Sequence, residues 1–107
     1  MTSLSGVIVV TGAASGIGRA SALHFAACGA TVVGADIKAF TPEAKNIHPI
    51  VADLTQEEDC RTVAALADSL GTVRGLFNCA GLELHGNVET TPLAEWNTVI
   101  AVNLTAL

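Results

Sequence analysis

Three glycines near the amino terminus are spaced so that they could form a binding site for phosphate groups. Gly12, Gly16 and Gly18 follow the apolar run Val7–Val10 and precede a segment with helical periodicity. Such a run is typical of a buried parallel strand, so the glycines fall in a strand-to-helix turn. The first N–H groups of a helix have no partner within it, and the helix dipole adds positive charge there. A pyrophosphate fits such a turn, although three glycines can also mark an ordinary one.

An acidic residue, Asp36, is placed to select the sugar of a nucleotide. It follows the β-branched segment Thr31–Ala35, which we predict to be the second strand. A carboxylate at this position, about 20 residues after the glycine turn, can accept hydrogen bonds from both hydroxyls of an adenosine ribose. It also repels a 2′-phosphate, and Lys38 is the nearest following cation. The residues favour NAD over NADP; the alternative is that Asp36 caps a turn.

The glycine spacing resembles the cofactor motif of the short-chain dehydrogenase/reductase family, Thr-Gly-x-x-x-Gly-Ile-Gly after an amino-terminal strand. The residues that match it are Thr11, Gly12, Gly16, Ile17 and Gly18. The general dinucleotide fingerprint, Gly-x-Gly-x-x-Gly, is spaced differently. The resemblance implies a NAD-dependent oxidoreductase that interconverts a small-molecule alcohol and a carbonyl by hydride transfer. It implies cofactor contacts in this turn from Gly12, Ser15, Gly16, Ile17 and Gly18.

Two later stretches also resemble the family. The resemblance implies that the Asp53 carboxylate accepts a hydrogen bond from the adenine amino group and that the Leu54 N–H meets the ring; alternatively, Asp53 only ends a strand. The stretch 78–81, Asn-Cys-Ala-Gly, resembles the family's Asn-Asn-Ala-Gly, with Cys79 in place of the second Asn. A reactive thiol at Cys79 would need a paired base, and none is in view. The implied cofactor contacts are Asn78, Ala80 and Gly81.

Asn103 resembles the helical catalytic Asn of the family. It lies on the apolar stripe of a helix predicted from Thr91 onward, where a buried hydrogen-bonding role is the alternative. The family's catalytic Ser, Tyr and Lys have no match, and the chain contains no Tyr. Because the sequence stops at Leu107 inside this stripe, we expect residues 1–107 to be the truncated amino-terminal part of one NAD-binding domain, inactive alone. The alternative function is a free-standing, non-catalytic nucleotide-binding or assembly module.

The segments between these residues predict an α/β fold, the amino-terminal half of a Rossmann-type doubly wound parallel sheet. We expect four strands in the order 3-2-1-4 with helical crossovers, the third strand, Ile47–Ala52, lying at or near an edge because of Pro49. Segment 39–46 leaves room for at most a turn or so of helix. The fourth strand is Val73–Asn78.

Two helices are predicted between the strands. The apolar stripe of the first is Ile17, Ser21, Phe25 and Cys28, with Gly29 ending the helix, and that of the second is Cys60, Val63, Ala67 and Leu70, with Gly71 ending it. Thr55 and Glu58 have the spacing of a capping box, which places the second helix's N-cap at Thr55.

The composition of the chain limits which classes of partner are expected. The chain has 107 residues and a net charge of −5 without a basic cluster, so nucleic acid is not an expected partner. No apolar run reaches the length of a membrane span, and the first residues lack signal-peptide features. Three widely spaced cysteines suggest neither a disulfide framework nor a metal site, and they favour a reducing cytoplasm. Half of the residues are hydrophobic, so we expect some apolar surface to meet a partner, as in a homo-oligomer, or to meet missing chain.

Overall fold

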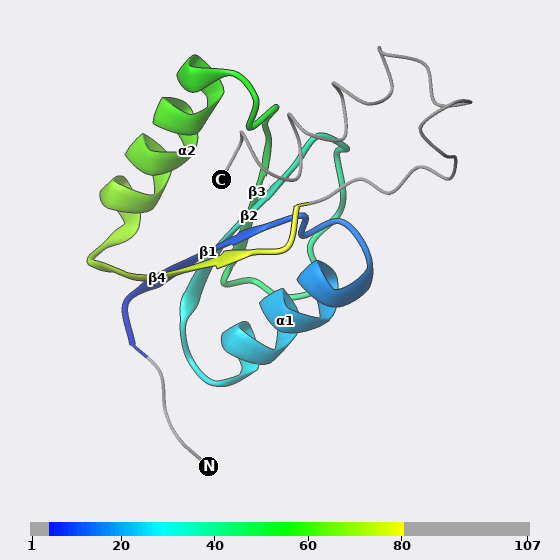
Figure 1. Cartoon of the computed structure of the whole chain (residues 1–107). Coiled ribbons are helices and arrows are strands. Elements are labelled where there is room, and N and C mark those ends of the chain that lie inside the picture. Colours follow the sequence, from blue (N-terminus) through cyan, green and yellow to red (C-terminus); the bar gives the residue numbers. More distant parts are fainter. Residues whose placement is uncertain (1–4, 81–107) are drawn as a thin grey trace.

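The computed structural model describes residues 5–80, which form a parallel sheet with one helix on each face (Figure 1). The elements are β1 (Val7–Thr11), α1 (Gly16–Ala27), β2 (Thr31–Asp36), β3 (Ile47–Val51), α2 (Glu57–Leu70) and β4 (Val73–Asn78). The strands lie in the order β3-β2-β1-β4, and all three pairings are parallel. The predicted doubly wound sheet and its strand order are therefore confirmed. Gly81 and Asn103 lie outside the described residues.

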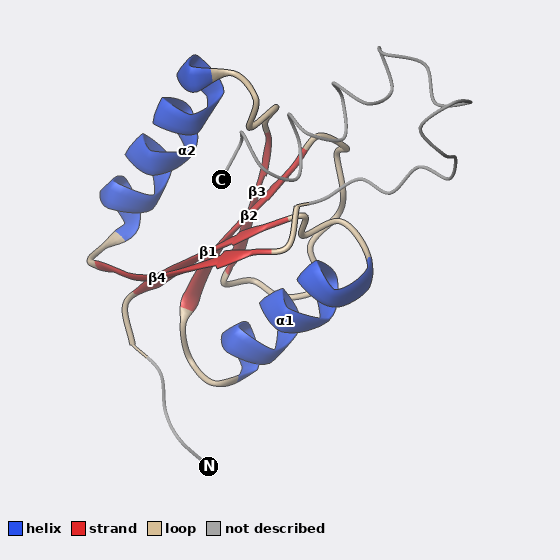
Figure 2. Cartoon of the chain, in the orientation of Figure 1, coloured by secondary structure: helices blue, strands red, loops and turns tan. Residues whose placement is uncertain are grey.

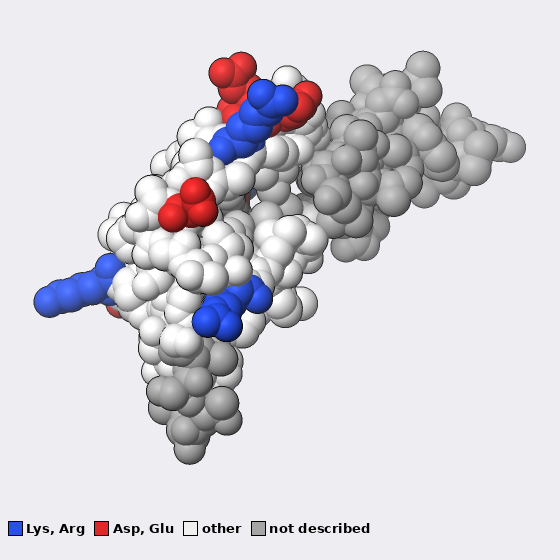
Figure 3. Space-filling view, turned by 90° about the vertical axis from the view of Figure 1, so that its left-hand side faces the viewer, with Lys and Arg blue, Asp and Glu red and all other residues white. Residues whose placement is uncertain are grey.

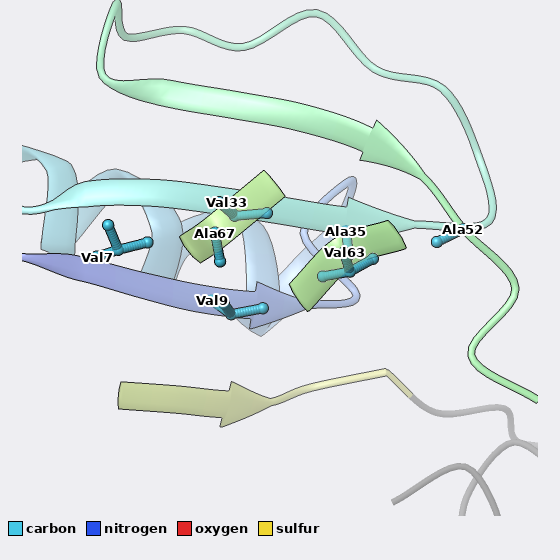
Figure 4. Close-up of a cluster of buried hydrophobic side chains, with 7 residues drawn as sticks. All are labelled: Val7, Val9, Val33, Ala35, Ala52, Val63 and Ala67. Carbon is cyan, nitrogen blue, oxygen red and sulfur yellow. The ribbon is translucent and has the colours of Figure 1, made fainter. Parts of the chain in front are cut away.

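The interiors of the two central strands are apolar because both of their faces are buried, and their polar residues, Thr11, Thr31 and Asp36, lie at strand ends. Alternate side chains of a strand point to opposite faces. Val7 and Val9 therefore pack toward α2, while Val10 packs toward α1. Figure 4 shows the first of these clusters, in which side chains from β1, β2 and α2 meet. The cluster consists of Val7, Val9, Val33, Ala35, Ala52, Val63 and Ala67.

The predicted stripe of α1 is confirmed only in part: Cys28 is buried and Phe25 packs against the core, but Ile17 does not. The residues that α1 buries are Gly18, Ala22 and Ala26, whereas Ile17 is 75% exposed. The reason is the closeness of α1 to the glycine turn: a Cβ at Gly18 would lie 2.0 Å from the Gly12 carbonyl oxygen. Only small side chains fit a contact this close, so Gly18, Ala22 and Ala26 face the sheet and Ile17 lies outside the core. The predicted helix end is confirmed, with Gly29 at a φ of 99°.

The connection between β2 and β3 contains no helix, which is within the limit of a turn or so that its sequence sets (Figure 2). Asn46 anchors the connection: its side-chain Nδ2 donates to the carbonyl oxygens of Ala26 and Ala30, at 2.9 and 2.7 Å. β3 pairs with β2 at the edge of the described sheet, as predicted from Pro49. A proline is tolerated there because an edge strand has one side free of ladder hydrogen bonds.

α2 begins one residue later than the capping-box prediction, with Gln56 rather than Thr55 as its N-cap and no side-chain capping bond. The Thr55 hydroxyl donates instead to Asp53 Oδ1 at 2.6 Å. Because the Thr55 N–H also donates to Asp53 Oδ1, the Thr55 side chain is held in the turn after β3 and does not accept from the N–H groups of the helix. The predicted stripe of α2 is confirmed, since Val63 and Ala67 are buried and Leu70 packs against the same cluster.

On the face drawn in Figure 3, acidic and basic residues lie among uncharged ones rather than in a patch of one sign. No helix within residues 5–80 is long and apolar enough to cross a bilayer.

Candidate nucleotide-binding site

The sequence-predicted residues that the structure describes gather at one edge of the sheet. Because all pairings are parallel, the four strands end at the same edge. Thr11 at the end of β1 is in register with Asn78 at the end of β4, and Asp36 at the end of β2 is in register with Val51 at the end of β3. The glycine turn and the segment that begins with Asp53 follow β1 and β3 at this edge. In open parallel sheets, ligands bind at the carboxyl ends of the strands.

The glycines of the turn are required by its geometry. Gly12 and Gly16 have φ values of 67° and 58°, in the left-handed region that disfavours side chains. A Cβ at Gly12 would meet the Cys79 carbonyl oxygen at 2.7 Å, and one at Gly18 would overlap the Gly12 carbonyl. Gly16 differs, because nothing lies within 4 Å of its Cβ position. Gly12 and Gly18 thus allow close packing within the protein, and Gly16 faces open space.

The amino terminus of α1 is suited to an anion. Its N-cap, Ser15, makes no side-chain capping bond, and its first turn contains no acidic residue. The N–H groups of this turn and the positive end of the helix dipole are therefore not neutralised by a carboxylate of the helix itself. Ile17 projects into solvent beside them. Arg19 is paired with Glu43 of the β2–β3 connection. This arrangement can hold a phosphate or pyrophosphate.

Asp36 lies beside this turn. Its Oδ2 accepts a hydrogen bond from the Ala14 N–H at 3.0 Å, and its Oδ1 accepts one from the Lys38 N–H at 2.9 Å. A carboxylate has about four lone-pair positions, so two bonds leave acceptor capacity for hydroxyl groups of a ligand. The turn-capping role and a ribose-binding role are therefore compatible in one side chain.

The Thr11 hydroxyl joins β1 to the segment after β4. Its Oγ1 accepts hydrogen bonds from the N–H groups of Cys79 and Ala80, both at 3.0 Å. Thr11 is 4% exposed, so these bonds are shielded from water. Sequence reasoning matched Thr11 to a motif without giving it a role. The available signal was a hydroxyl at the end of an otherwise apolar buried strand, where it needs a partner.

Asp53 ends its strand in a compact turn. Its Oδ1 accepts hydrogen bonds from the hydroxyl and the N–H of Thr55, at 2.6 and 3.0 Å, while its own N–H donates to Asp59 Oδ2 at 2.8 Å. The bond from the Thr55 hydroxyl lowers the pKa of the Asp53 carboxyl most, and the bond from the Thr55 N–H lowers it further, so this pKa lies below its usual value. Asp53 is thus ionised at neutral pH, and its second oxygen, Oδ2, takes part in no hydrogen bond within residues 5–80.

We predict that Thr55→Val raises the pKa of Asp53 toward its usual value, because it removes the hydroxyl donor. Thr55→Ser, which keeps the hydroxyl, should leave the pKa low. A lowered pKa in the folded state means that ionised Asp53 stabilises the fold above the unfolded-state pKa, and that this contribution is lost as the pH falls through the folded-state pKa. NMR titration of the carboxyl carbon measures the shift; equal pKa values in the Val and Ser variants would contradict the assigned cause.

The described residues at this edge support neither a nucleophilic thiol nor a metal site. Burial raises the pKa of the Cys79 thiol, which lowers the thiolate fraction that a nucleophile needs. Within residues 5–80, no three His, Cys, Asp or Glu side chains are grouped so that they could hold a metal ion.

A groove of about 670 Å³ adjoins the site between α2 and the β1–β4 side of the sheet. Its lining residues are Val9, Thr11, Leu54, Cys60, Val63, Ala64, Ala65, Ala67, Asp68, Val73, Leu76 and Asn78. Leu54, Thr11 and Asn78 connect it to the carboxyl edge, and most of the remaining lining is apolar.

Comparison with known families agrees with this geometry. The family model described as short chain dehydrogenase matches residues 6–107. The chain belongs to the short-chain dehydrogenase family. A short-chain dehydrogenase/reductase of Penicillium canescens is 41% identical over 106 residues, which cover 94% of this chain and 41% of that relative. This short-chain dehydrogenase sequence therefore spans about two fifths of the length of that relative.

Solved structures of dehydrogenases and reductases share the fold. The ligand-free aldohexose dehydrogenase of Thermoplasma acidophilum matches with a TM-score of 0.84 and 32% identity, over 95% of this chain and 40% of that one. The 3-ketoacyl-(acyl-carrier-protein) reductase of Brucella melitensis, solved in complex with NADH, matches with a TM-score of 0.85 and 27% identity, over 94% and 45%. The described sheet is thus the amino-terminal half of the short-chain dehydrogenase fold.

Proposed function

We propose that the chain is the NAD-binding portion of an oxidoreductase that interconverts an alcohol and a carbonyl on a small molecule. The observation that carries the proposal is the glycine turn at the uncapped amino terminus of α1, open at Gly16 and flanked by Asp36. Family membership and the NADH complex of the Brucella reductase support the choice of a nicotinamide cofactor. The proposed domain is residues 1–107, and the free cysteines of the described part suit a reducing compartment such as the cytoplasm.

The residues present fit such a cofactor. The N–H groups of the turn and of the first residues of α1 would hold the pyrophosphate, with Gly16 leaving room for it. Asp36 would accept hydrogen bonds from the ribose hydroxyls, and Asp53 with Leu54 would meet the adenine. The nicotinamide ring supplies the hydride chemistry when bound. The remaining contacts in the proposal are Gly12, Ser15, Ile17, Gly18, Asn78, Ala80 and Gly81, with Asn103 as a catalytic residue.

We predict that the chain binds NADH at least about tenfold more tightly than NADPH, a difference of about 1.4 kcal/mol in binding free energy. The Asp36 carboxylate would accept hydrogen bonds from the ribose hydroxyls and repel a 2′-phosphate. Asp36→Ala should bring the two affinities together. Glu58→Ala, which removes the same charge from an exposed position on α2, should leave the preference unchanged. Isothermal calorimetry measures both affinities; equal binding of NADH and NADPH by the unmodified chain would contradict the assignment.

The proposal includes association between copies of the chain. Within residues 5–80, β4 pairs on one side only, and Leu76 on it is 59% exposed beside the groove. Exposed apolar surface at a sheet edge favours association. We expect light scattering to give a mass above that of the monomer, and Leu76→Lys to lower it. Val51→Lys, at a residue 60% exposed on the opposite edge strand, should not. A monomeric unmodified chain would contradict this proposal.

A further inference from the structure

The Asp36 carboxylate connects two parts of the candidate site. The Ala14 N–H that donates to its Oδ2 at 3.0 Å lies 22 residues earlier, in the glycine turn. Its other oxygen is held by the Lys38 N–H, which fixes the carboxylate against the end of β2. Hydrogen bonds to a charged acceptor are stronger than those between neutral groups. The side chain therefore ties the turn after β1 to the end of β2.

The glycine turn has few other means of keeping its shape. Gly12 and Gly16 can adopt many backbone conformations. Ala13 is buried in the core, but the Ala14 side chain is a methyl group outside it. Ser15 makes no capping bond with its side chain. The segment 13–15 is joined to the end of β2 by two hydrogen bonds: the Ala13 N–H donates to the Ala35 carbonyl at 3.2 Å, and the Ala14 N–H donates to Asp36. The first of these hydrogen bonds joins two backbone groups. Only the second, which Asp36 accepts with its side chain, can be removed by a substitution.

We infer that Asp36 is a positioning residue for the glycine turn, in addition to its proposed contact with ribose. The carboxylate orients Ala14, and through it the N–H groups that would face a pyrophosphate. The link to the ligand rests on the proposed function, whereas the effect on the turn does not. A contact that only recognises ribose would leave the turn unchanged in the absence of nucleotide. A positioning residue shapes the turn before any nucleotide binds.

Two variants of equal charge separate these roles. Asp36→Asn loses the charge but keeps one carbonyl oxygen that can accept from Ala14, whereas Asp36→Ala loses both. Amide hydrogen exchange, measured residue by residue without nucleotide, reports the bond directly. The amide of Val33, fully buried in β2, reports the stability of the whole fold in the same sample. We expect exchange at Ala14 to be faster in the Ala variant by about tenfold or more relative to Val33, with the Asn variant in between.

Binding of inorganic pyrophosphate, which has no ribose, is the second measurement. The Asn variant should bind it more tightly than the Ala variant, because only the Asn variant can still hold the turn. Unchanged exchange at Ala14, or acceleration equal to that at Val33, would overturn the inference. Equal pyrophosphate affinities for the two variants would overturn the link to the anion site. Failure of the unmodified chain to bind NADH would instead count against the proposed function, since the exchange measurement uses no nucleotide.

Discussion

Gly18→Ala is expected to lower the free energy of unfolding by about 3 kcal/mol and to abolish nucleotide binding. The added Cβ would lie 2.0 Å from the Gly12 carbonyl oxygen and 3.1 Å from that of Thr11. Both neighbours are backbone atoms at the junction of β1 and α1, so the helix or the turn has to move. Thermal or urea unfolding measures the loss of stability, and titration with NADH measures the loss of binding.

Gly16→Ala is the matched control because it adds the same methyl group two residues away. No atom lies within 4 Å of that Cβ position, and the φ of 58° falls in the left-handed region, at a cost of about 1 kcal/mol. The methyl group would occupy the space proposed for the pyrophosphate. This variant should therefore fold but bind NADH more than about tenfold less tightly. If Gly18→Ala were as stable as Gly16→Ala, the close packing of α1 on the turn would not be the reason for Gly18.

Thr11→Val is expected to destabilise the fold by about 2 kcal/mol, because two N–H groups lose their acceptor while the side-chain shape is kept. Those groups belong to Cys79 and Ala80, and the site around Thr11 is buried. For a domain of this size, the midpoint of thermal unfolding should fall by about 10 °C. Thr11→Ser retains the hydroxyl and should cost about 1 kcal/mol for the lost methyl group. Equal midpoints for the Val and Ser variants would contradict the role of the hydroxyl.

The parts of the fold that the sequence predicts correctly depend on local patterns. Val7–Val10 is apolar at every position and Thr31–Ala35 is apolar after Thr31, as a strand buried on both faces requires. Gly29 and Gly71 end helices with positive φ values that other residues rarely adopt. Pro49 restricts its strand to an edge. In each case one residue type, or one short run of residues, favours a single local structure.

The parts that the sequence does not predict correctly depend on contacts across the chain. The stripe predicted for α1 includes Ile17, but the close approach of Gly18 to the turn leaves Ile17 exposed and places Ala22 and Ala26 on the buried face. Thr55 has the pattern of an N-cap, yet its hydroxyl binds the nearer carboxylate of Asp53. The bond from Ala14 to Asp36 joins residues 22 positions apart, and no local pattern indicates it.

The most direct test of the account is a titration of the chain with NADH, followed by the amide signals in a two-dimensional NMR spectrum. The account predicts that the largest shifts occur at Ser15–Gly18 and around Asp36, with smaller shifts at Leu54, and that Gly16→Ala removes them. Saturable shifts confined to other parts of the sheet, or no shift at a concentration that saturates related dehydrogenases, would contradict the claim that the carboxyl edge of this sheet binds the cofactor.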